Sequence, residues 1–220
     1  LVLPPFVGAI GLKAMLGRSG ALNSLLGTDW DLLGQHRFWG VAIALALHLY
    51  PIIFLNATAS IANLDPALDE AGKTCGASAW MRFFRVTLPL IRPGLFAGGA
   101  IVFVWSFTEL GTPLMFDYYD VTSVQIFNGI KKMSASAEPY ALTAVLLELS
   151  VVFYVLGKSA LGRAGYASST RAFRSGGPSR LGPVGVVLTT AFFALVTGAA
   201  ILPHVGVVLM SLAPPGSWYG

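Results

Sequence analysis

Residues 68–94 read LDEAGKTCGASAWMRFFRVTLPLIRPG, a charged block that contains three glycines. It holds acids and bases together, yet it lies between two runs of residues that carry almost no charge. Its charged residues are Asp69, Glu70, Lys73, Arg82, Arg85 and Arg92. A polar block between two apolar runs is typical of a loop that joins two membrane-spanning helices.

The composition of the whole chain indicates an integral membrane protein. Of its 220 residues, 55% are hydrophobic and 11% are charged, whereas about a quarter of the residues of a soluble domain are charged. The net charge is +4, but the basic residues are scattered in small loop groups, so we expect no nucleic acid partner. Cys75 is the single cysteine, which excludes an internal disulfide and a metal site built from several cysteines. We expect no metal site.

Four segments are long and apolar enough to cross a membrane as helices, because the hydrocarbon core requires about 20 mostly apolar residues. They cover residues 38–61, 94–116, 139–161 and 183–212. The opening segment is shorter and holds Pro4 and Pro5, so it is either the end of a further span or an interfacial segment. The predicted fold is therefore an all-α polytopic membrane helix bundle with about four to five spanning helices.

Basic residues in the loops set the orientation of the spans. The loops after the first and third spans lie on the same side of the membrane and hold nine of the 14 lysines and arginines. These nine are Lys73, Arg82, Arg85, Arg92, Lys158, Arg163, Arg171, Arg174 and Arg180. Because loops rich in Lys and Arg stay on the inner side, we expect both loops to be cytoplasmic.

The sequence of the first cytoplasmic loop predicts two short helices joined by a turn. Asn63 or Asp65 can cap the first helix, and Pro66 suits its first position. Gly76 stands where a residue in the left-handed conformation would end that helix. Residues 78–88 can form a second helix. We expect Pro89 and Pro93 to stop it.

The composition of this loop by itself allows a simple interpretation. A basic amphipathic loop that lies on lipid headgroups explains the arginines and the apolar face formed by Trp80, Phe83 and Phe84. It does not explain the order of the residues. An acid is followed by alanine, a glycine stands six positions after the acid, and a Leu-Pro pair begins twelve positions after the glycine.

That order resembles the EAA loop of permease subunits in binding-protein-dependent ABC importers. The family pattern is Glu-Ala-Ala, three residues, Gly, nine residues, Ile, any residue and Leu-Pro. The corresponding residues here are Glu70, Ala71, Gly72, Gly76, Val86, Leu88 and Pro89. Ala77, which follows Gly76, is counted with them. The sequence departs from the pattern at Gly72, where the family generally has Ala, and at Val86 in place of Ile. Gly72 is expected to weaken the first helix by about 0.5 to 1 kcal/mol relative to Ala.

The resemblance implies that residues 65–93 form a coupling loop, which docks into a cytoplasmic ATP-binding subunit. Glu70 would contact the ATPase or hold the loop, and Gly76 would make the turn. Leu88 and Pro89 would seat the loop against the membrane core. The chain itself would be no enzyme and would bind no cofactor, because ATP binds to the partner subunit. Consistently, the chain has no Walker-type loop.

The resemblance also implies the other partners and the location of the protein. The partners would be an extracytoplasmic substrate-binding protein, the remaining permease half and membrane lipid. The location would be the bacterial inner (plasma) membrane, crossed several times.

Four stretches are similar to permeases of ferric iron importers in particular. They are LPPFVGAIGLKAMLG (3–17), GALNSLLG (20–27), FFRVTLPLIRPGLFAG (83–98) and FTELGTPLMF (107–116). Such permeases commonly have two tandem halves in one chain. On this basis residues 1–174 form most of a first half without its N-terminal part, 175–182 form a cytoplasmic linker, and 183–220 begin a second half. Ferric iron is the expected substrate, although permeases for thiamine, polyamines and phosphonates look alike.

Two acids, Glu109 and Glu148, lie within predicted spans. Ionisable groups in a membrane are costly and usually functional. Each of these acids either lines the translocation path or makes a hydrogen bond to a neighbouring helix. A non-transport alternative is an intramembrane enzyme that uses the two carboxyl groups as an acid/base pair.

Overall fold

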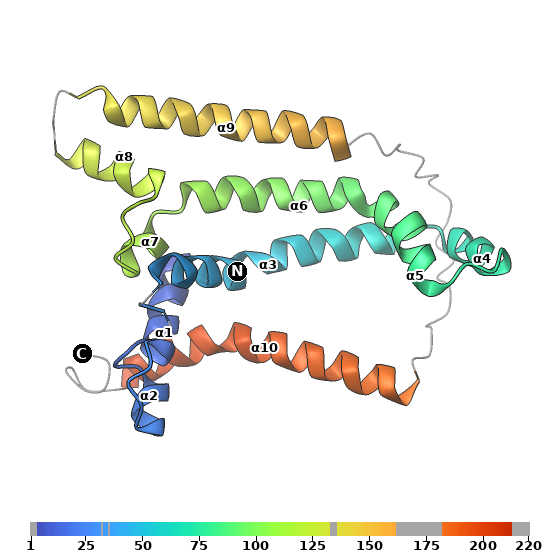
Figure 1. The fold of residues 1–220 in the computed structure, drawn as a ribbon, viewed down its shortest axis with the longest axis horizontal. Coiled ribbons are helices and arrows are strands. Elements are labelled where there is room, and N and C mark those ends of the chain that lie inside the picture. Colours follow the sequence, from blue (N-terminus) through green and yellow to red (C-terminus); the bar gives the residue numbers. More distant parts are fainter. Residues whose placement is uncertain (1–3, 32, 35, 133–135, 162–181, 213–220) are drawn as a thin grey trace. The chain divides into compact units, whose positions relative to one another are not determined.

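The computed structural model describes residues 4–31, 33–34, 36–132, 136–161 and 182–212, and these residues contain helices but no strand. Figure 1 labels the helices in chain order. They are α1 (Pro5–Leu16), α2 (Ala21–Leu26), α3 (Arg37–Ala62), α4 (Pro66–Thr74), α5 (Ala79–Arg82), η1 (Phe83–Thr87), α6 (Leu88–Thr108), α7 (Gly111–Met115), α8 (Thr122–Lys131), α9 (Glu138–Leu161) and α10 (Pro183–Leu212). The predicted all-α class is confirmed. Most of the predicted linker, at 175–181, lies outside the described residues.

Four helical segments are long and apolar enough to cross a membrane. They are Arg37–Ala62 (α3), Ala79–Thr108 (α5, η1 and α6), Glu138–Ala160 (in α9) and Pro183–Leu212 (α10). The predicted first, third and fourth spans agree with these bounds to within one residue. Helix α1 has 12 residues and is about 18 Å long, too short to cross the hydrocarbon core by itself. The described residues thus form a polytopic helical protein with four candidate spans.

The second span differs from its prediction at both ends. Residues 94–116 are predicted to form it, yet the helix begins at Ala79 and ends at Thr108. The two prolines expected to stop the loop helix, Pro89 and Pro93, lie inside this continuous helix. That prediction is therefore wrong.

A π-helical turn, η1, explains how the helix passes Pro89. In this turn the N–H of Leu88 donates to the carbonyl of Phe83, five residues earlier, so the turn is wider than an α-helical turn. In a regular α-helix a proline ring clashes with the carbonyl four residues before it, which here is that of Arg85. The wider turn moves this carbonyl away from the ring, and the helix continues into the span.

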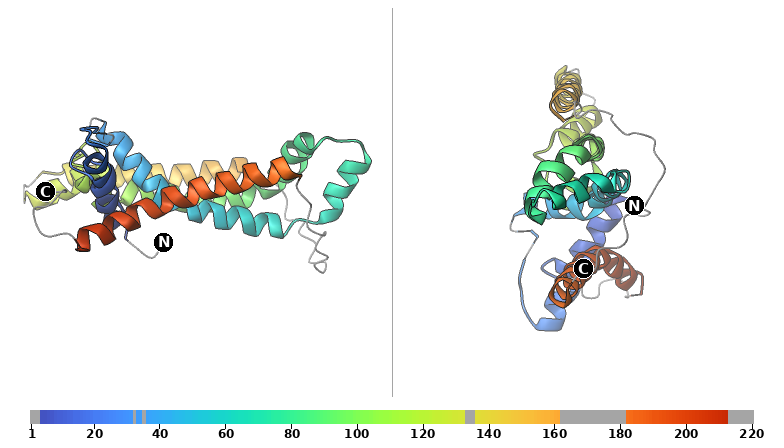
Figure 2. Two further views of the ribbon diagram at one scale, coloured as in Figure 1. Left: turned by 90° about the horizontal axis from the view of Figure 1, so that it is seen from below. Right: turned by 90° about the vertical axis from the view of Figure 1, so that its right-hand side faces the viewer.

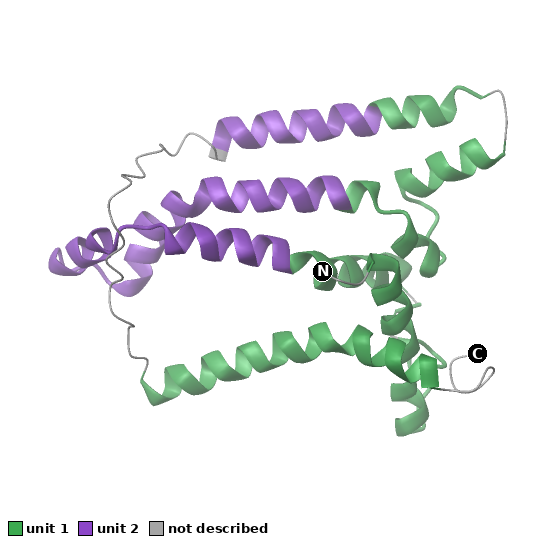
Figure 3. Cartoon of the chain, turned by 180° about the vertical axis from the view of Figure 1, so that it is seen from behind, with its two compact units in different colours: residues 1–50, 106–144, 181–220 green, residues 51–105, 145–180 purple. Residues whose placement is uncertain are grey.

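The chain divides into two compact units, which Figure 3 colours separately. Unit 1 comprises residues 1–50, 106–144 and 181–220. Its core residues are Ala9, Leu12, Leu33, Val41 and Phe116. Within it α1 packs against α10 where Gly11 meets Pro203 and Gly206. A Cβ atom on either glycine would overlap backbone atoms of the other helix, so glycine permits this close crossing.

Unit 2 comprises residues 51–105 and 145–180. Within it α6 packs against α3, because Gly94 and Gly98 leave room for Ser60 and Asn56. The helices of the loop, α4 and α5, lie beyond this packed pair, at the end of α3 and the beginning of α6 (Figures 1 and 2). The predicted coupling loop is therefore held at one end of two packed spans.

Candidate functional site

Helix α4 begins at a side-chain cap. The carboxylate of Asp65 accepts the backbone N–H of Ala67 at 2.9 Å, and Pro66 occupies the first helical position. This arrangement satisfies an amide that has no partner within the helix. The structure thus decides between the two predicted caps in favour of Asp65 over Asn63.

Gly76 makes the turn after α4. Its φ is +74°, in the left-handed region that favours glycine. The N–H of Gly76 donates to the carbonyl of Lys73 at 2.9 Å, and the N–H of Ala77 donates to that of Gly72 at 3.0 Å. These two bonds form a Schellman motif, which closes the C-terminus of α4. The Ser78 hydroxyl then caps α5 by accepting the N–H of Met81 at 3.3 Å.

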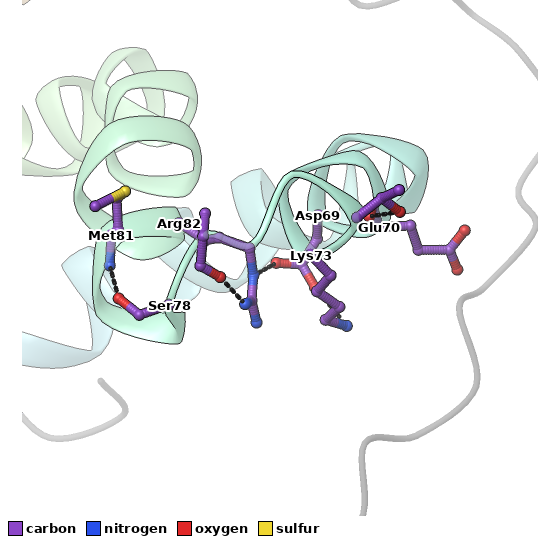
Figure 4. A network of polar contacts seen from close by, with 8 residues as sticks. Asp69, Glu70, Lys73, Ser78, Met81 and Arg82 are labelled. Atoms are coloured by element: carbon purple, nitrogen blue, oxygen red, sulfur yellow. Dashed lines mark hydrogen bonds and ion pairs between the residues drawn. The ribbon is translucent and has the colours of Figure 1, made fainter.

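Arg82 connects the two helices across the turn (Figure 4). Its Nε donates to Oδ1 of Asp69 at 2.7 Å, and its Nη1 donates to the carbonyl of Ala77 at 2.8 Å. On α4, Nζ of Lys73 lies 2.8 Å from Oδ2 of Asp69. The hydrogen bonds from Lys73 and Arg82 hold the pKa of Asp69 below its ordinary value. Asp69 therefore stays ionised and fully occupied by partners within the loop.

Glu70, the next residue, is in the opposite situation. Its side chain is exposed, and its carboxylate has no ion pair among the residues that the structure describes. Figure 4 shows the carboxylate pointing away from the cluster of Asp69 and Arg82. The backbone carbonyl of Glu70 accepts the Thr74 hydroxyl at 3.0 Å. Glu70 is therefore free to bind a group on another chain.

Gly72, where the sequence departs from the family pattern, lies beneath Arg82. A Cβ atom at this position would lie 2.9 Å from Cδ and 3.2 Å from Cγ of Arg82. Because Gly72 has no side chain, the aliphatic stem of Arg82 packs directly against α4 at this position, which we call its seat. The sequence indicated only the cost of this glycine to the helix. The pair of Asp69 and Arg82 was not predicted, although opposite charges stand on either side of the predicted turn.

Apolar side chains on the loop are exposed. Trp80 is 74% exposed, and its ring centroid lies 4.6 Å from that of Phe84, which in turn lies 5.0 Å from that of Phe83. Leu68 and Met81 are also exposed. A continuous group of exposed apolar side chains is typical of a surface that contacts another protein or lipid. Of the remaining motif residues, Ala71 is exposed, whereas Ala77, Leu88 and Pro89 are partly buried.

Glu109 follows the second span instead of lying within it. Its Oε1 accepts the N–H groups of Gly111 at 3.1 Å and Thr112 at 3.2 Å, and the Thr112 hydroxyl at 3.4 Å. Its backbone carbonyl accepts the Ser123 hydroxyl at 2.8 Å. This carboxylate accepts the first amides of α7. The predicted position of Glu109 within a helix is therefore wrong, because α6 ends at Thr108. Whether it lines the path stays a prediction.

Glu148 lies in the middle of α9, and its side chain is exposed. It belongs to unit 2, whereas Glu109 belongs to unit 1. The structure therefore does not describe an acid/base site that the two acids share. The described residues also contain no group of three or more His, Cys, Asp or Glu side chains that could hold a metal ion.

Comparison with known proteins decides the family. Residues 1–162 match the family described as the binding-protein-dependent transport system inner membrane component. The chain belongs to this family. This membership confirms the resemblance to importer permeases and places the chain in the inner membrane. Family members are permeases, which supports the expectation that the chain is not an enzyme.

Relatives of the chain are named for the transport of different substrates. The chain is 30% identical over 173 residues to a putative ferric transport system permease protein of Haemophilus influenzae. The aligned residues make up 76% of the chain and 27% of the relative. It is 32% identical over 160 residues to a ferric transport system permease protein of Actinobacillus pleuropneumoniae, covering 71% and 23%. A molybdenum transport system permease protein of H. influenzae is 35% identical over 116 residues, covering 53% and 51%. The chain thus spans about a quarter of the length of the ferric relatives.

Proposed function

We propose that the protein containing this chain imports ferric iron, and that residues 65–93 couple ATP hydrolysis on a separate subunit to this uptake. The observation that carries the coupling role is the folded loop at the end of two spans, with Gly76 in its turn and the carboxylate of Glu70 unpaired. Membership of the permease family supports it. The partners are the ATP-binding subunit, an extracytoplasmic substrate-binding protein, the remaining permease half and lipid.

The loop acts mechanically in this proposal. Glu70 binds a cationic side chain of the ATP-binding subunit, and the exposed apolar side chains of α4 and α5 pack into the same partner. When ATP brings two ATP-binding subunits together, the docked loop moves with them. Because Ala79–Thr108 is one continuous helix, movement of its first turn moves the span that follows. The span then changes the access of the path from one side of the membrane to the other.

Ferric iron is the preferred substrate because the ferric relatives match the largest shares of the chain, 76% and 71%. An oxyanion is the second candidate, favoured by the molybdenum relative at 35% identity and by a sulfate transport system permease protein of Escherichia coli at 28% identity over 155 residues. A metal cation and an oxyanion differ in the sign of their charge. Uptake of radioactive iron, molybdate and sulfate by the full complex in vesicles, with each candidate binding protein, separates the two.

The division of the chain into two permease halves is also a proposal. Residues 1–174 form the first half, 175–182 the linker, and 183–220 the beginning of the second half. The family match over residues 1–162 and the separate span α10 support this division. The greater length of the ferric relatives leaves room for the rest of a second half.

Replacement of Glu70 tests the coupling role. In the full-length permease, Glu70→Ala removes the free carboxylate, and we expect the purified complex to retain less ATP-binding subunit and to take up less substrate. Glu138→Ala is a matched control, because it also removes an exposed acid but at the N-terminus of α9, on the opposite predicted side. Unchanged retention and uptake with Glu70→Ala would contradict the role of Glu70.

A further inference from the structure

Helix α4 is held to the rest of the protein mainly by polar contacts. None of its residues is buried, and the same is true of α5 and η1. Burial of apolar side chains therefore contributes little to fixing its direction. The turn after α4 contains Gly76 in the left-handed conformation, and the backbone bonds of the turn end at Ala77. Beyond them, the side chain of Arg82 provides a further link between the two helices.

Arg82 is well suited to fixing an orientation. Its side chain is only 17% exposed, against 46% for Asp69 and 55% for Lys73. One guanidinium binds both Asp69 on α4 and the carbonyl of Ala77 in the turn. Because a guanidinium is planar and rigid, two bonds from one group define an angle as well as a distance. A lysine at the same position carries its donors on a single flexible nitrogen, so it does not reproduce the fixed geometry of this pair of bonds.

Gly72 is part of the same arrangement. The stem of Arg82 crosses α4 at this residue, and a Cβ there would lie 2.9 Å from Cδ. A larger side chain at position 72 would push the stem away and separate the guanidinium from Asp69. The structure thus contains a seat for the arginine as well as its ion-pair partner.

Arg82 also belongs to the first turn of the continuous helix Ala79–Thr108. We propose that Arg82 is a positioning residue that clamps α4 onto this helix, so that a displacement of α4 is transmitted to the membrane span instead of being absorbed at Gly76. This inference rests on the proposed function of the loop. In this inference Arg82, Asp69 and Gly72 make the loop stiff. Glu70 and the exposed apolar residues bind the partner.

Separate measurements of ATP hydrolysis and substrate uptake test the clamp. The full-length permease, its ATP-binding subunit and its binding protein are reconstituted into lipid vesicles. With Arg82→Ala we expect hydrolysis to continue, while the substrate transported per ATP hydrolysed falls about tenfold, as the loss of a hydrogen bond to a charged group allows. Arg85→Ala is the control, because it removes the same charge from an exposed side chain in the next turn. We expect it to preserve the ratio.

Two further variants distinguish a clamp from a simple need for positive charge. Arg82→Lys keeps the charge but not the paired bonds, so we expect it to restore only part of the ratio. Gly72→Leu fills the seat with a good helix former, so we expect the same loss as Arg82→Ala. The double variant should then be no worse than either single one, because both act on one contact. Full rescue by lysine, or additive losses in the double variant, would overturn the inference.

The outcomes also separate this inference from the proposed function. If the wild-type permease retains no ATP-binding subunit, the proposed function fails. If wild type couples hydrolysis to uptake and Arg82→Ala and Gly72→Leu couple equally well, only the clamp fails. If Arg82→Ala does not accumulate in the membrane, Gly72→Leu decides, because it leaves every charged residue in place.

Discussion

Two neighbouring acids in the loop have different surroundings. Asp69 is occupied by Lys73 and Arg82, whose hydrogen bonds lower its pKa, whereas Glu70 is exposed and unpaired within the described residues. Successive helical residues point about 100° apart, so one acid faces the second helix of the loop and the other faces away. The sequence showed two adjacent acids, but only the arrangement of α4 and α5 shows which of them is free.

Gly76 is required for its backbone conformation and not for lack of space. Its φ is +74°, and a Cβ atom there would meet nothing within 4 Å. Gly76→Ala should therefore cost about 1 kcal/mol of loop stability, Gly76→Asn less, and Gly76→Val more, because left-handed backbone is tolerated in that order. Uptake by the full complex should fall in the same order. Equal uptake by the Asn and Val variants would show that the turn does not matter.

At the scale of the element, the π turn is the feature that sequence periodicity could not reveal. A period of 3.6 residues predicts that Pro89 stops a helix, because it assumes that every carbonyl keeps its α-helical position. One wider turn removes the clash, and the loop helix and the span become one helix. The predicted cap, turn and first helix were correct because each depends on local backbone chemistry alone.

The two prolines of α6 should respond differently to replacement. Pro89→Ala restores an N–H that can bond to the carbonyl of Arg85, which would convert the π turn to an α-helical one and rotate α5 relative to α6. Pro93→Ala is the control, because the residues directly before Pro93, 88–92, are α-helical. We expect Pro89→Ala to reduce uptake several-fold at an unchanged level in the membrane, and Pro93→Ala to leave uptake close to wild type. Equal effects would contradict a specific role for the π turn.

Glu109 has hydrogen-bond partners at the beginning of α7 that the sequence did not predict. One oxygen of its carboxylate accepts all three hydrogen bonds. Glu109→Ala should lower the stability of the purified full-length permease by about 1 kcal/mol, measured as a fall in Tm. Glu109→Gln keeps an oxygen acceptor and should remain close to wild type in both Tm and uptake. Loss of uptake by Glu109→Gln at unchanged Tm would show that the charge acts on the substrate.

At the scale of the whole molecule, the sequence predicted the helical class and three of the four spans, because runs of apolar residues depend only on the thickness of the membrane. It did not predict the contact between Arg82 and Asp69 or the hydrogen bonds of Glu109 to α7. Both depend on how helices turn at their ends, which the apolar pattern does not record. The exposed faces of α9 and α10 likewise have no explanation within this chain, and we expect lipid and the remaining permease half to cover them.

Covalent capture of the loop's neighbour tests whether the loop docks onto the ATP-binding subunit. A photoreactive amino acid is placed at Ala71, which is exposed on α4, in the full-length permease assembled with its ATP-binding subunit in membranes. The same group at Tyr140, which is 77% exposed near the N-terminus of α9, serves as the control. On illumination the proposal predicts an adduct with the ATP-binding subunit from position 71 and none from position 140. An active complex in which position 71 captures only lipid would contradict it.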